Sequence, residues 1–290
     1  MSKSFLLIEQ FLQDAYDLNF SQPLNKIISS IKELKIACEI IINIIKEYRK
    51  PTITELILLF PLLKVSFTWS QLKLDKSRDN EKFLKRIIKR LKNDVDQGNF
   101  YGTIFEIDMA SRCLLSNWTI EFIEKNPKGT KQKQIEFLFI QDGRVIGIEC
   151  LSKRYGADDL TIEKINSDIE QKASKFKHFN TKLDERLLII DVTTSDFSKP
   201  KILDDIGNLH RKHLLEAVIF TYTLKENAEA DDDFSLIEKY ESFGDVENRY
   251  FTTTYATEIR KGPIIFIRKY VEPEPTHGVW GPEENIKDYH

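Results

Sequence analysis

The segment 134–150 most constrains the fold, because it has the pattern of two β-strands joined by a tight turn. Residues 134–140 (QIEFLFI) and 145–150 (VIGIEC) are rich in β-branched and aromatic side chains, and Asp142-Gly143 lies between them. An Asp-Gly pair between two such runs is a strong signal for a β-hairpin. The sequence therefore predicts part of a sheet here.

Each predicted strand of this hairpin carries one glutamate. Because side chains alternate between the two faces of a strand, Glu136 shares a face with Leu138, and Glu149 shares one with Leu151. The two acids can therefore face each other across neighbouring strands. An ionised carboxylate on so apolar a sheet is costly to bury unless a cation or a hydrogen-bond donor compensates it, so a bound cation is the simpler explanation.

A third acid lies on a helix predicted upstream of the hairpin. Apolar residues recur at helical spacing through residues 100–115, which include Glu106. Residues 117–123 indicate a strand, residues 159–179 a helix and residues 186–192 a further strand. The predicted order is therefore helix, strand, hairpin, helix, strand.

These elements together resemble the core of the PD-(D/E)XK nuclease superfamily over residues 100–195. The resemblance rests on Glu106 with Ala110 and Leu114, the strand at Trp118, the acid before Phe137, and Glu149-Cys150 ending a strand. It implies a restriction-endonuclease-like α/β fold with a central mixed sheet flanked by helices. It also implies Mg²⁺ or Mn²⁺ bound by Glu106, Glu136 and Glu149, with Glu106 bound directly or through water.

One position departs from the superfamily's pattern. The resemblance implies a lysine two residues after the last acid, where it would orient or activate water, but Leu151 stands there. Lys153 has the same strand parity as Glu149, but it lies about 13 Å further along an ideal strand at ~3.3 Å per residue. Because of the shared parity, Lys153 is the candidate water-positioning group. Because of its offset, Lys164 or Lys172 on the following helix could substitute for it.

The resemblance implies metal-assisted hydrolysis of phosphodiester bonds by an endonuclease. Carboxylate and carbonyl oxygens are hard ligands that suit Mg²⁺ or Mn²⁺, which would activate a water and neutralise charge on the scissile phosphate. The same resemblance favours DNA as the substrate, and it is consistent with a homodimer.

Two alternatives remain open at this point. Leu151 favours a catalytically inactive module of the same fold that binds nucleic acid or a partner protein. The helical first half of the chain could instead be the functional part, gripping a partner through an apolar groove while the β-rich half serves as scaffold.

The first 98 residues have almost no strand pattern, so we predict a helical N-terminal domain over 1–98. The nuclease-like domain would span 99–270, and the proline-containing residues 271–290 would form an irregular tail. Within the first region, helices are expected around 5–15, 23–48 and 80–96, and another begins near Pro51, where Thr52 or Thr54 could cap it.

The helix expected at 80–96 is the most basic element of the chain. It pairs an apolar stripe with a cationic face that could bind phosphates, although such a face is also typical of an ordinary solvated helix. The candidate nucleic-acid-binding residues are Lys85, Arg86, Lys89, Arg90 and, beyond the hairpin, Arg154.

Composition indicates a globular protein with a sizeable core. The chain has 290 residues, 41% of them hydrophobic, and its net charge of −3 gives no support for a broadly basic nucleic-acid binder. The apolar runs 40–45 and 57–67 are short or interrupted by Lys64, so we expect no membrane span and a cytoplasmic location. The three cysteines lack CxxC spacing and are expected to be reduced and buried.

The pattern after residue 192 is weaker. Strands are predicted over 217–224 and 263–268, with an acidic loop over 226–233 between them. Residues 202–215 indicate a helix that carries His210 and His213, for which a surface or phosphate-contacting role is favoured over a metal pair.

Overall fold

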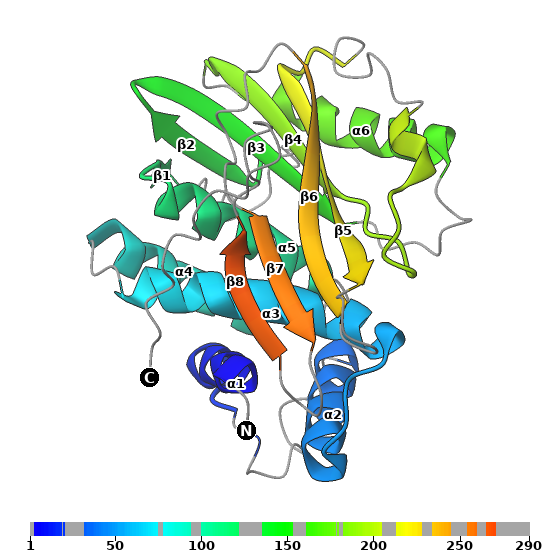
Figure 1. Cartoon of the computed structure of the whole chain (residues 1–290). Coiled ribbons are helices and arrows are strands. Elements are labelled where there is room, and N and C mark those ends of the chain that lie inside the picture. The colour runs from blue at the N-terminus through cyan, green and yellow to red at the C-terminus, as the bar shows by residue number, and fades with distance from the viewer. Residues whose placement is uncertain are drawn as a thin grey trace, which may run out of the picture.

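The structure is a mixed α/β fold, here described from a computed structural model (Figure 1). The residues described are 3–18, 20, 32–74, 78–93, 100–121, 135–152, 161–177, 179, 182–204, 213–227, 234–244, 254–259 and 265–270. Within them lie six α-helices and a mixed eight-stranded sheet, so the predicted class of mixed sheet with flanking helices is confirmed.

The helices and strands have the following bounds. The helices are α1 (Lys3–Tyr16), α2 (Lys32–Glu47), α3 (Ile53–Leu74), α4 (Arg78–Asn93), α5 (Phe100–Leu115) and α6 (Ile162–Lys177). The strands are β1 (Thr119–Glu121), β2 (Phe137–Gln141), β3 (Arg144–Ser152), β4 (Glu185–Asp191), β5 (Ala217–Asn227), β6 (Phe234–Gly244), β7 (Thr254–Ile259) and β8 (Ile265–Tyr270).

The strands follow one another across the sheet in chain order. β1, β2 and β3 are antiparallel, β3, β4 and β5 are parallel, and the remaining pairs to β8 are antiparallel. The predicted hairpin is confirmed, because Gln141 pairs with Arg144 around Asp142 and Gly143, whose positive φ angles of 50° and 76° suit a tight turn. Parallel pairing of β3 with β4 requires a crossover, and α6 lies within it.

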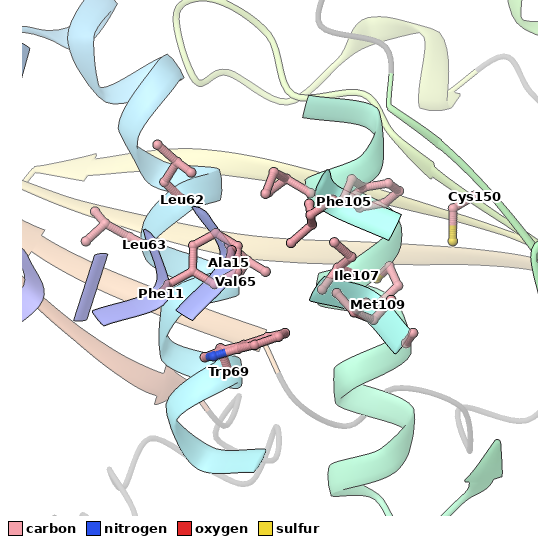
Figure 2. Close-up of a cluster of buried hydrophobic side chains, with 14 of the residues drawn as sticks. Phe11, Ala15, Leu62, Leu63, Val65, Trp69, Phe105, Ile107, Met109 and Cys150 are labelled. Atoms are coloured by element: carbon pink, nitrogen blue, oxygen red, sulfur yellow. The ribbon is translucent and has the colours of Figure 1, made fainter. Parts of the chain in front are cut away.

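Alternate side chains of β3 belong to two different hydrophobic cores. Ile148 and Cys150 pack into the cluster formed with α1, α3 and α5, whereas Val145 and Leu151 pack against the cluster that includes α6. Figure 2 shows the first cluster, in which Cys150 of β3 lies beside residues of α5. Its labelled members on the helices are Phe11, Ala15, Leu62, Leu63, Val65, Trp69, Phe105, Ile107 and Met109. Residue 149 therefore faces the α6 side of the sheet.

Helix α3 begins where the sequence predicts, through a capping box at Thr52 and Glu55. The Glu55 N–H donates to Thr52 Oγ1 (3.2 Å), and the Thr52 N–H donates to Glu55 Oε2 (2.7 Å). Among the described residues α3 is the one helix long and apolar enough to cross a membrane, judged by length and composition alone. Of its most apolar window 61% is buried inside the fold, which core helices also show, so this is weak evidence for a span.

The sequence missed β6 and β7, and its predicted acidic loop is partly wrong. β5 continues to Asn227 because it pairs with β6 along its whole length, so Glu226 and Asn227 lie on a strand. The helix predicted over 202–215 is also partly wrong, since a 3₁₀ turn covers Lys201–Asp204 and residues 213–215 are not helical, while residues 205–212 lie outside the described part of the chain. His210 and the tail 271–290 lie outside the described residues. The three cysteines are free and buried, as expected.

Candidate functional site

Glu136 and Glu149 come together on adjacent segments of the sheet. Glu149 lies within β3 and is fully buried, and Glu136 lies at a bend one residue before β2 begins. The Glu136 N–H donates to Glu149 Oε1 (2.8 Å), and the Cys150 N–H donates to Glu136 Oε2 (2.6 Å). Where β2 pairing ends, each carboxylate thus accepts a backbone donor from the other segment.

Two lysines of α6 cover these carboxylates. Lys172 Nζ lies 2.6 Å from Glu136 Oε1 and 3.4 Å from Glu149 Oε2, and it also donates to the Cys150 carbonyl oxygen at 2.6 Å. Lys175 Nζ lies 2.5 Å from Glu149 Oε2 and 3.3 Å from Glu136 Oε1. We call these four side chains the open cluster, because the side chains of Lys172 and Lys175 remain 17% and 22% exposed.

Gly147 allows α6 and its flanking segment to pack closely over this part of β3. A Cβ at position 147 would lie 2.9 Å from Leu183 Cδ1 and 3.1 Å from Phe176 Cε1. Phe176 follows Lys175 directly on α6 and is buried in the cluster on that face. The small residue on β3 therefore makes room for the helix that carries both lysines.

The environment shifts the pKa values of the two acids in opposite directions. Burial and then the charge of Glu136 raise the pKa of Glu149 to about 8. Burial also opposes ionisation of Glu136, but the ammonium groups of Lys172 and Lys175 outweigh it and lower its pKa. Burial disfavours the charged form of Lys172 too, yet Glu136 and Glu149 prevail and raise its pKa. Glu149 is therefore the less stabilised anion of the pair.

Glu106 lies close to this cluster without completing a group of three acids. It is buried on α5, and its charge contributes to raising the pKa values of Lys172 and Cys150. No group of three or more His, Cys, Asp and Glu side chains that could hold a metal ion occurs in the described part of the chain. The structure thus brings together two of the three predicted acids, and the convergence of all three on one cation stays a prediction.

One of the two lysines that contact the acids is a predicted substitute. Lys172 contacts both carboxylates, whereas Lys153 and Arg154 lie outside the described residues. The sequence reasoning missed Lys175, although its spacing from Lys172 places the two on one face of a helix. This spacing identifies Lys175 as a residue of the site only when α6 is known to lie over β3.

The basic helix α4 has the predicted amphipathic form. Lys85, Arg86 and Lys89 lie on one side with partial or full exposure, and Phe83 and Ile87 on the other side are buried. Arg90 is on this helix, but its side chain is outside the described part. Binding of nucleic acid by this face stays a prediction.

A second group of charges lies sealed between α3, α5 and β6. Arg112 donates to Glu238 through Nη1 (2.5 Å) and Nη2 (3.1 Å), and its Nη2 also donates to Asp108 (2.5 Å). Lys64 Nζ donates to the same Glu238 at 2.6 Å. We call Lys64, Asp108, Arg112 and Glu238 the closed cluster, because each of these side chains is at most 5% exposed.

No protein-family model and no curated protein matches this chain. The function is therefore inferred from the residues themselves.

Proposed function

We propose that this protein is a metal-dependent nuclease that hydrolyses phosphodiester bonds at the open cluster. One observation carries the proposal: two carboxylates and a backbone carbonyl, from Glu136, Glu149 and Cys150, lie around the ammonium of Lys172. Buried oxygens so arranged form a position for a cation. The resemblance to the PD-(D/E)XK superfamily favours DNA as the substrate.

The donor set fits Mg²⁺ or Mn²⁺. Both ions prefer carboxylate and carbonyl oxygens, and the described site offers these without a histidine or thiolate that would favour zinc. Glu136 and Glu149 would hold the metal together with the Cys150 carbonyl, and buried Glu106 would act from α5 directly or through water. When bound, the metal would lower the pKa of a water and neutralise charge on the scissile phosphate.

The α6 lysines would supply the positive charge that the hydrolysis requires. The oxygen of a water attacks phosphorus and the water gives up a proton, the bond from phosphorus to the leaving oxygen breaks, and the leaving oxygen takes up a proton. Negative charge grows on the non-bridging oxygens during this step, and a preorganised ammonium stabilises it. Lys172 and Lys175 are partly exposed beside the carboxylates, so either can reach a bound phosphate from the solvent side.

The order of elements supports the same proposal. Helix α5, strand β1, the β2–β3 hairpin, helix α6 and strand β4 follow in the order that the resemblance implies for the catalytic core. The proposed ligands lie on α5, one residue before β2 and on β3, where the resemblance implies the helix and the two strands. On this proposal the role expected of Lys153 passes to a lysine of α6.

A second candidate is a module of this fold that has lost catalysis. Leu151 favours it, and so does the charge balance, because Lys172 and Lys175 already pair with both carboxylates. Such a protein would bind nucleic acid or a partner protein without cleaving a bond.

Cleavage assays with matched variants distinguish the two. The purified chain is incubated with linear, circular and single-stranded DNA and with RNA, in Mg²⁺, in Mn²⁺ and in chelator. We expect metal-dependent cleavage that falls by at least about 100-fold in Glu149→Gln, the scale of losing one electrostatic contact to the reaction. Glu170→Gln removes an exposed acid of α6 and should cleave normally. Absence of cleavage on every substrate, or equal cleavage by Glu149→Gln, contradicts the proposal.

A further inference from the structure

The Lys172 ammonium lies where a metal ion would bind. Its Nζ contacts the Cys150 carbonyl and Glu136 Oε1 at 2.6 Å each and lies 3.4 Å from Glu149 Oε2. An ammonium has three donors and no acceptor, and here it makes two hydrogen bonds and one longer ion pair with these three oxygens. They are also the oxygens assigned above to the metal, so lysine and metal require the same position.

The two cations cannot both use these oxygens. The open cluster contains two carboxylates and two ammonium groups, and both carboxylates already have short contacts to lysine. A divalent ion added within a few ångströms of Lys172 Nζ would meet a like charge in a partly buried setting, where repulsion is strong. Among the residues described, Glu106 does not complete a separate site with the other two acids. Metal can therefore enter only as Lys172 leaves.

The positions of the two lysines indicate which one leaves. Lys172 donates to the Cys150 carbonyl, whereas Lys175 makes its shorter contact to Glu149 Oε2 and lies 3.3 Å from Glu136. Both side chains are partly exposed, 17% for Lys172 and 22% for Lys175, so each ammonium has a path to solvent and the carbonyl contact is what distinguishes them. Both lysines contact Glu136 Oε1 and Glu149 Oε2, but the bond to the Cys150 carbonyl is made by Lys172, so the departure of Lys172 is what frees that third oxygen.

We infer that Lys172 is an internal competitor of the metal, so that loading the site exchanges a tethered ammonium for a divalent ion. This inference rests on the proposed function and adds a regulatory property to it. The site is filled by its own lysine at low metal concentration, which keeps two buried carboxylates compensated in the metal-free protein. Metal binding then releases a cation on the solvent side of the cluster.

Calorimetric titration with Mn²⁺ alone tests the exchange without any cleavage step. Lys172→Met removes the competitor and should bind Mn²⁺ about tenfold tighter than the parent or more, within the usual range of coupling between sites. Lys177→Met removes an exposed lysine of the same helix and should bind like the parent. Lys172→Gln keeps an uncharged donor toward the Cys150 carbonyl, so it decides the matter if the methionine variant does not fold.

The outcomes separate this inference from the proposed function. Unchanged or weaker Mn²⁺ binding by the folded Lys172 variants, with clear binding by the parent, overturns the exchange and leaves the metal site intact. Absence of Mn²⁺ binding by the parent and by every variant overturns both. Tighter binding by Lys172→Met and by Lys177→Met alike would show that general charge is responsible, which also overturns the exchange.

Discussion

The open and closed clusters contain the same charges but differ in how those charges are compensated. Each pairs two carboxylates with two cationic side chains. In the closed cluster Arg112 donates to Glu238 through two nitrogens, and its Cζ lies 4.4 Å from the centroid of the Tyr255 ring. In the open cluster both cations are lysines, whose compact charge and flexible stem hold a carboxylate less firmly than the guanidinium fork.

The pKa values of Glu238 and Glu149 reflect this difference in how the charges are compensated. Burial opposes ionisation of Glu238, but Arg112 and Lys64 outweigh it and lower the pKa to about 2. Glu149 is also buried, yet its pKa is raised to about 8 because burial and Glu136 prevail over the two lysines. The sealed pair with a guanidinium therefore keeps its carboxylate ionised, whereas the surroundings of the open cluster disfavour the ionised form of Glu149. The first arrangement suits structure, and the second suits binding.

Removing a cation from the closed cluster should have the largest effect on stability. Arg112→Met leaves Asp108 and Glu238 buried, with Lys64 paired to Glu238, and we expect a loss of about 3–5 kcal/mol in the free energy of unfolding. Lys175→Met in the open cluster should lose about 1 kcal/mol or less, since Lys172 still contacts both acids and solvent reaches the site. Urea denaturation measures both, and equal losses would contradict the distinction.

Acid should weaken the closed cluster. The folded pKa of Glu238 lies below its ordinary value of 4.5, so its contribution is fully present above about pH 4.5 and is lost as the pH falls toward 2. The full contribution is on the order of 3 kcal/mol. The difference in urea stability between the parent and Glu238→Gln should shrink over that range. A difference that stays constant between pH 6 and pH 3 would show that Glu238 titrates normally.

Manganese should stabilise the protein through the open cluster alone. At about 100 times its Kd the ion would add about 2.7 kcal/mol, which differential scanning fluorimetry detects as a rise in Tm. Glu149→Gln should lose this rise, and Thr68→Val, which alters only the closed cluster, should keep it. A rise that persists in Glu149→Gln would place the ion elsewhere.

A small effect should also come from the neutral donor of the closed cluster. Thr68 Oγ1 donates to Asp108 Oδ1 at 3.0 Å, and Thr68→Val removes that bond while Arg112 keeps its contact to Asp108. We expect a loss of about 1 kcal/mol, typical of one buried hydrogen bond, and recovery in Thr68→Ser. A loss as large as that of Arg112→Met would mean that the cluster depends on its hydroxyl rather than on its charges.

Local patterns in the sequence were enough to predict the hairpin, α5, α6 and β4. Turn chemistry at Asp142-Gly143 and alternation along β3 were also enough to predict that Glu136 and Glu149 lie together. β6 could not be predicted in this way, because its charged Glu238 breaks the apolar pattern. The partners of Glu238 lie far away in the chain, with Lys64 on α3 and Arg112 on α5.

Local sequence patterns were also insufficient to predict which lysines reach the open cluster. The spacing of Lys172 and Lys175 in the sequence places them on one face of a helix, but no local sequence pattern predicts that this face packs over β3. That placement depends on the parallel crossover from β3 to β4 and on the space above Gly147. Tertiary packing thus decides which lysine reaches the acids, and it favours one on the helix over the expected position two residues after Glu149.

A crystal structure with Mn²⁺, read through the anomalous signal of the metal, tests the central claim most directly. We predict one strong peak between the carboxylates of Glu136 and Glu149 and the carbonyl of Cys150, with the Lys172 ammonium moved away from all three. The closed cluster should have no peak and unchanged contacts. If millimolar Mn²⁺ gives no peak at the open cluster and Lys172 keeps its contacts, the cluster is a structural ion-pair group and the account is wrong.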